Sequence, residues 1–171
     1  MSTPSWRSLA IQTLNCLAPT DRLSILGVGS ELRGDDAVGL EIATRLQSRL
    51  ASSTCQVIVA GASPENFTSL VRSFQPALVL LIDAAQLDEP PGTIRWLTPQ
   101  AIAALPATTH ALPLNLLTQY LQDALHCQVA LIGIQPQQTE FQAPLTPSIQ
   151  LAAAEVVEVI VNTLLQPKLA D

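Results

Sequence analysis

Two carboxylates and one imidazole are the side chains of this sequence best suited to share a chemical site. Asp36 is the second of two adjacent acids that follow a short apolar run and a Gly-x-Gly turn, and Asp83 directly follows six apolar residues. His110 lies in a loop segment further along the chain, and His126 is the other histidine. Carboxylate oxygens and imidazole nitrogens together ligate divalent transition metals, with water or a substrate group completing the shell. The residue types therefore predict a metal site formed by Asp36, Asp83 and His110.

Each of these residues also has a structural interpretation. Asp35 can cap the helix that follows it, or it can accept a proton as a catalytic base, and both interpretations stay open. Two adjacent acids are not both needed for one cap, which favours a functional role for Asp36. A carboxylate at the end of a buried strand must find a proton, a donor or a metal, so function explains Asp83 better than a turn does. His110 alone is equally consistent with a ligand and with an ordinary loop residue.

The remaining candidate residues have simpler explanations. His126 follows a predicted helix, where it interacts favourably with the negative helix terminus, so we do not expect it to be catalytic. Cys16, Cys55 and Cys127 are odd in number and widely spaced, which fits neither a metal motif nor a disulfide framework. We interpret all three as small buried apolar residues of a cytoplasmic protein.

The elements that must position these residues alternate between strands and helices, which predicts an α/β fold: a single three-layer domain with a mainly parallel sheet flanked by helices. The third strand is apolar on both faces, as expected at the centre of such a sheet. Because parallel strands end at the same edge, Asp36 and Asp83 are expected to converge there. The predicted strands are Leu23–Val28, Gln56–Ala60, Leu78–Ile82, Thr93–Leu97 (at a sheet edge) and Val129–Ile134, and the predicted helices are Val38–Leu50, Ser63–Phe74, Thr98–Leu105, Leu114–Leu125 and Thr146–Leu164. Thr146, which directly precedes Pro147, is expected to cap the last helix.

The first 22 residues are predicted to be an extension, and residues 23–171 the domain proper. Apolar residues in the extension have rough helical spacing, and Pro19, Thr20 and Asp21 then break the pattern. We expect a short amphipathic helix that lies on the domain.

Composition excludes several classes of protein. The chain has 171 residues, of which 48% are hydrophobic and only 13% charged, which excludes a disordered chain or a coiled coil. The net charge of −6 gives no positive field for a phosphate backbone, so we expect no nucleic-acid partner. The longest fully apolar run, Ala77 to Ile82, is far shorter than the ~20 residues of a membrane helix, so we expect no membrane insertion.

Common enzyme motifs are absent from the sequence. Gly27 and Gly29 begin a dinucleotide-binding pattern, but its last position is Leu32 and no acid follows the second strand. The chain also contains no phosphate-binding P-loop, no nucleophile elbow of the Gly-x-Ser-x-Gly type and no His-Glu-x-x-His zinc helix.

Four sequence blocks, taken together and in this order, resemble the nickel–iron hydrogenase maturation proteases. They are Gly27 to Gly39 (GVGSELRGDDAVG), Ile82 to Ala85 (IDAA, followed by Pro91-Gly-Thr93), Thr108 to Asn115 (TTHALPLN) and Gly133 to Pro136 (GIQP). The last two blocks, with Gly61 to Asn66 (GASPEN), look most like the branch that processes the large subunit of formate-hydrogenlyase-type hydrogenase.

The resemblance implies a twisted five-stranded sheet and an endopeptidase that removes the C-terminal extension of a hydrogenase large-subunit precursor after nickel insertion. It implies that Asp36, Asp83 and His110 contact nickel that the precursor supplies, and that Asp36, Asp83 and the contested Asp35 are the candidate catalytic acids of an aspartic-type or metal-assisted peptidase. We expect the protein to be a monomer. The alternative to an endopeptidase is a non-catalytic nickel-binding checkpoint protein of hydrogenase assembly. A third possibility, a flavodoxin-like protein that binds small ligands, is suggested by fold analogy alone.

Overall fold

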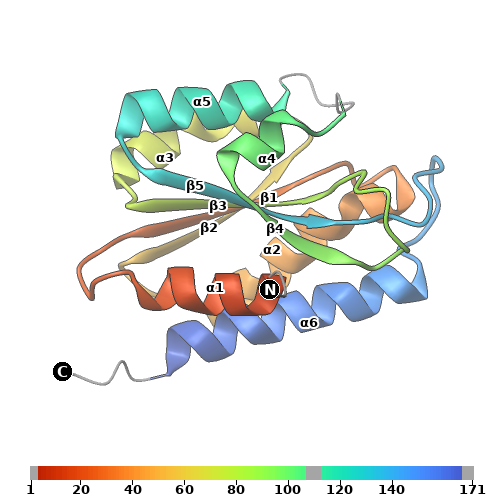
Figure 1. Ribbon diagram of the computed structural model, residues 1–171, viewed down its shortest axis with the longest axis horizontal. Coiled ribbons are helices and arrows are strands. Elements are labelled where there is room, and N and C mark those ends of the chain that lie inside the picture. Colours follow the sequence, from red (N-terminus) through yellow and green to blue (C-terminus); the bar gives the residue numbers. More distant parts are fainter. Residues whose placement is uncertain (1–3, 107–112, 167–171) are drawn as a thin grey trace.

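The computed structural model describes residues 4–106 and 113–166, and it consists of one five-stranded sheet between two layers of helices (Figure 1). The strands are β1 (Leu23–Val28), β2 (Cys55–Gly61), β3 (Leu78–Ala84), β4 (Ile94–Leu97) and β5 (Gln128–Ile134). The α-helices are α1 (Trp6–Asn15), α2 (Val38–Arg49), α3 (Thr68–Phe74), α4 (Pro99–Ala103), α5 (Leu114–Leu125) and α6 (Pro147–Leu165), and two short 3-10 helices are η1 (Gly34–Ala37) and η2 (Pro64–Phe67).

The strand order is β2-β1-β3-β5-β4. The first four strands of that order run parallel, and β4 pairs antiparallel with β5 at the edge, from Ile94 opposite Ile134 to Leu97 opposite Leu131. The predicted α/β class, the mainly parallel sheet and the position of the edge strand are therefore confirmed. The order also places β1, which leads to Asp36, beside β3, which carries Asp83.

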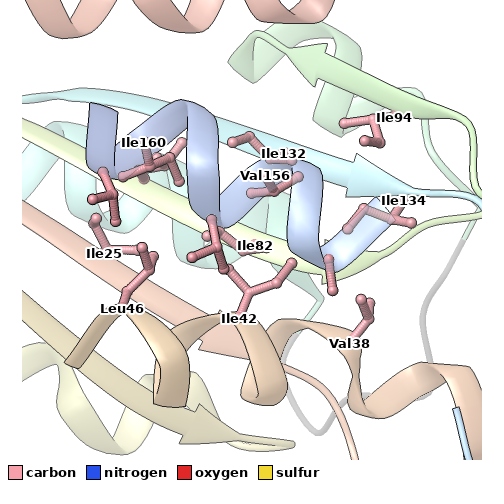
Figure 2. Packing of buried hydrophobic residues seen from close by; sticks show 14 of the residues in the cluster. Ile25, Val38, Ile42, Leu46, Ile82, Ile94, Ile132, Ile134, Val156 and Ile160 are labelled. Carbon is pink, nitrogen blue, oxygen red and sulfur yellow. The ribbon is translucent and has the colours of Figure 1, made fainter. Parts of the chain in front are cut away.

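Helices cover both faces of the sheet, with α1, α2 and α6 on one side and α3, α4 and α5 on the other (Figure 1). Successive side chains of β3 alternate between these layers: Leu78, Leu80 and Ile82 join one core cluster, while Val79 and Leu81 join the other. Both faces of the central strand are thus buried, which is why its sequence is continuously apolar. Figure 2 shows the first cluster, in which Ile25, Ile82 and Ile132 of the sheet pack against Ile42 and Leu46 of α2 and Val156 and Ile160 of α6.

The predicted N-terminal helix is present as α1, and it packs on α6 (Figure 1). Ala10 and Leu14 are fully buried, and Leu14 belongs to the core cluster of that face. An ion pair of 2.9 Å between Arg7 and Glu155 joins the exposed sides of the two helices. The helix therefore contributes to the hydrophobic layer beneath the sheet.

Two local expectations were wrong. Cys16 is exposed and follows the last residue of α1, whereas Cys127 is buried. Cys55 is half-buried, and burial raises the pKa of its thiol to about 11. The predicted capping residue Thr146 does precede α6, but its side chain does not cap the helix. Its hydroxyl instead binds Asp35, as described below.

Helix α6 is long and apolar enough, by length and composition alone, to cross a membrane. In the structure 44% of its most apolar window is buried, and its inner face packs against the sheet and α2 (Figure 2). Its hydrophobicity is thus explained in large part by its place in the core.

The start of α2 lies directly on the ends of β1 and β3, and Gly39 makes this contact possible. A Cβ atom at Gly39 would lie 2.2 Å from both the Ile82 and the Val28 carbonyl oxygens. We expect Gly39→Ala to lower the free energy of unfolding by about 3 kcal/mol or more, because the added methyl group would clash with backbone oxygens of β1 and β3, which cannot move aside without disturbing the sheet. Urea unfolding measures the loss.

Gly61→Ala is the matched control for this substitution. Gly61 has open space around the added methyl group, but its φ of +68° is strained for alanine, so we expect a loss of only about 1–2 kcal/mol. Equal losses in the two variants would contradict the close packing of α2 on the strand ends.

Candidate active site

The topology brings the two predicted metal-binding acids to one edge of the sheet. Gly27 of β1 is opposite Ile82 of β3 in a parallel register, so both strands end together, and Asp83 follows at that edge. The turn η1, which carries Asp36, contacts β3. Asp83 is fully buried and Asp36 is 9% exposed. The structure thus places both residues at the same edge of the sheet, at the carboxyl ends of β1 and β3.

The loop after β1 folds back tightly on Asp36. The Ser30 amide donates both to the Asp36 carbonyl oxygen, at 3.2 Å, and to its carboxylate Oδ2, at 3.1 Å. Gly29 has a φ of +138°, and a Cβ atom there would lie 1.8 Å from the Asp36 carbonyl oxygen. The Gly-x-Gly sequence is thus explained by the close approach of this loop to η1, and it orients the Asp36 carboxylate.

Asp83 lies on the face of β3 that its neighbours Val79 and Leu81 share, towards the layer of α3, α4 and α5. On the adjacent strand its partner is Gly133. A fully buried carboxylate destabilises the folded state unless hydrogen bonds or an opposite charge replace the water it has lost. Asp83 differs in this respect from the apolar residues before it in β3. His110, the third predicted ligand, falls in residues 107–112 and lies outside the residues that the structure describes.

Asp35 has a different environment from its neighbour Asp36. Its Oδ2 accepts hydrogen bonds from the amides of Gln137 (2.9 Å) and Gln138 (3.0 Å), and its Oδ1 accepts one from the amide of Thr146 (2.7 Å). The Thr146 hydroxyl lies 3.1 and 3.0 Å from the two oxygens. The side chain is fully buried and makes no capping bond to η1. Asp35 therefore joins η1 to the loop between β5 and α6.

Gln135, which was not singled out from the sequence, organises a second loop at this edge. Its Oε1 accepts hydrogen bonds from the amides of Leu87 (2.7 Å) and Glu89 (3.5 Å), and its Nε2 donates to Gln86 Oε1 at 3.2 Å. The side chain is 5% exposed. The signal that could have revealed it is its place in the GIQP block, beside the end of β5.

Within residues 4–106 and 113–166, no three side chains of the His, Cys, Asp and Glu types are grouped closely enough to hold a metal ion. Asp36 and Asp83 can supply two oxygen ligands, so a complete shell needs donors from another part of the chain or from a substrate. Carboxylates in this position can also accept a proton from an attacking water.

These features define an α/β domain with a carboxylate site at the carboxyl ends of its parallel strands, where open sheets bind their ligands. The family model of the HycI hydrogenase maturation proteases matches residues 40–163, which include Asp83 and His110 and begin four residues after Asp36. The hydrogenase 3 maturation protease of Escherichia coli K12 is 33% identical over 135 residues, which are 78% of this chain and 85% of that protein.

Solved structures agree with these sequence matches. The crystal structure of the [NiFe] hydrogenase maturation protease HycI from Thermococcus kodakarensis superposes with a TM-score of 0.82 at 26% identity, covering 91% of this chain and 99% of that one. The solution structure of the endopeptidase HycI from E. coli gives a TM-score of 0.71 at 32% identity, covering 80% and 87%. The chain belongs to the hydrogenase maturation protease family. The predicted family is thereby confirmed, and with it the assignment as a hydrolase.

The different roles of the two adjacent acids can be tested by their effects on stability. We expect Asp35→Asn to lower the free energy of unfolding by about 2–4 kcal/mol, because the amide nitrogen cannot accept a hydrogen bond and leaves buried amides of the β5–α6 loop without a partner. Asp36→Asn, whose carboxylate accepts one amide, is expected to cost about 1 kcal/mol or less. Urea unfolding of both variants measures the difference, and a larger loss for Asp36→Asn would contradict the assignment.

Proposed function

We propose that this protein is an endopeptidase that removes the C-terminal extension of a nickel–iron hydrogenase large-subunit precursor after nickel has been inserted. The observation that carries the proposal is the pair of acids at the carboxyl edge of the sheet, the fully buried Asp83 and the nearly buried Asp36. Membership of the maturation protease family supports the reaction class.

Recognition is proposed to depend on nickel that the precursor already holds through its cysteines. Asp36 and Asp83 offer carboxylate oxygens and His110 an imidazole nitrogen, a donor set that suits divalent nickel. The nickel is part of the substrate, so its capture would report that metal loading is complete. An unloaded precursor lacks the cation that these donors would ligate, and it would bind poorly.

Peptide hydrolysis requires a base for the attacking water and stabilisation of the developing charge on the scissile carbonyl oxygen. We propose that Asp36 or Asp83 accepts the proton of the water and later returns it to the leaving amine. Substrate nickel, once bound, would polarise the carbonyl group or acidify the water. An aspartic-type reaction, in which nickel serves recognition alone, uses the same two residues. Asp35 is assigned to the structure of the site, since each of its oxygens accepts hydrogen bonds from the β5–α6 loop.

The proposal is tested by incubating the purified protein with the nickel-loaded large-subunit precursor from the same genome and measuring the product by intact-protein mass spectrometry. We expect one shortened product, and no cleavage of the unloaded precursor or of an isolated extension peptide. Asp36→Asn and Asp83→Asn are expected to lower the rate by at least about 10²-fold, the usual size of a lost proton-transfer group.

Asp123→Asn is the matched control, because Asp123 is an exposed acid in α5 and its substitution should leave the rate unchanged. Lack of cleavage by the wild-type protein would contradict the protease function and favour a non-catalytic nickel checkpoint. Full activity of both Asp36→Asn and Asp83→Asn would contradict the site assignment instead.

A further inference from the structure

Two large apolar side chains are exposed on adjoining loops at the edge of the sheet that carries the candidate active site. Leu32, in the loop between β1 and η1, is 49% exposed, and Phe141, in the loop between β5 and α6, is 68% exposed. The Gln142 amide donates to the Leu32 carbonyl oxygen at 2.8 Å, which places the backbones of the two loops side by side at these residues. The other large exposed apolar residues of the described chain lie on helices.

The loops that carry this pair are held firmly. Asp35 binds the β5–α6 loop at Gln137, Gln138 and Thr146, and the Asp35 amide donates back to the Gln138 carbonyl oxygen at 3.0 Å. Gly34, with a φ of +51°, lets the Gln138 side chain pack so closely that an added Cβ would lie 2.7 Å from it. The backbone that carries Leu32 and Phe141 is thus ordered before any partner binds, which lowers the entropy cost of binding.

We infer that Leu32 and Phe141 form a docking surface for an apolar side chain of the folded large-subunit precursor, next to the segment that is cut; this inference rests on the proposed function. Two observations select this partner. Leu32 lies in the loop that leads to Asp36, so the surface is carried by the same loop as the proposed site. In the β5–α6 loop, residues 135–146 contain a single charged side chain, Glu140, so this part of the surface recognises its partner chiefly by apolar contact and shape.

The test is the dissociation constant of the nickel-loaded precursor for the immobilised protein, measured by surface plasmon resonance, together with kcat and KM of cleavage. We expect Leu32→Ser and Phe141→Ser to weaken binding separately, and the double variant to raise Kd and KM by at least about tenfold with kcat within about twofold. Both side chains are exposed, so the urea unfolding midpoint should not change. Leu151→Ser is the matched control, since Leu151 is 74% exposed on α6, and it should bind and cleave like the wild type.

The outcomes separate this inference from the proposed function. Cleavage by the wild type with unchanged Kd and KM in the double variant overturns the docking surface and leaves the protease function intact. Binding without cleavage by the wild type, weakened in the double variant, supports the surface and contradicts the protease. Absence of both binding and cleavage overturns both. If the double substitution instead converts a dimer to a monomer in sedimentation and leaves precursor binding unchanged, the surface joins two copies of this chain and the inference fails.

Discussion

The candidate active site depends on one buried carboxylate that is not expected to react. Asp35 is bound by groups 102 to 111 positions further along the chain, and through them it joins η1 to the loop that precedes α6. A buried charge of this kind is destabilising unless hydrogen bonds replace the water it has lost. Three amides and one hydroxyl make that replacement here. The same bonds fix the start of α2, and with it the position of Asp36, relative to the sheet.

Asp35 and Asp36 have different environments because both belong to a 3-10 turn, η1. Successive side chains in such a turn point about 120° apart, so one can face the β5–α6 loop while the next faces another direction. Asp35 is surrounded by donors on both oxygens, whereas the hydrogen bond to the Asp36 carboxylate comes from the Ser30 amide on one oxygen. Asp36 thus keeps lone pairs for a ligand, and its orientation is set by the loop that Gly29 allows to approach. The different hydrogen bonding of Asp35 and Asp36 thus follows from the geometry of η1.

Much of this fold could be predicted from the sequence, because its strands are short apolar runs bounded by clear breaks. The predicted limits of Leu23–Val28 are those of β1, and the location of Asp36 and Asp83 at one edge of the sheet follows from parallel strands that end together. The role of Asp35 could not be predicted in this way. Its partners Gln137 and Thr146 have no local pattern that points to a distant carboxylate, and Thr146 was interpreted as a helix cap because its position before Pro147 is typical of one. Cys16 was expected to be buried on residue type alone, which says nothing of its place after the last turn of α1.

Rigidity at this edge bears on how a maturation protease can be selective. A flexible apolar loop would bind many peptides, and a strongly charged one would attract any oppositely charged segment. The loop between β5 and α6 is neither, because Asp35 fixes it and one charge is present in residues 135–146. Selectivity then has to come from shape, which only a folded substrate presents in a defined way. Under the proposed function, one substrate has to meet two conditions at once: it must fit the apolar surface of Leu32 and Phe141, and it must bring a cation to Asp36 and Asp83. A precursor that is folded but unloaded satisfies only the first.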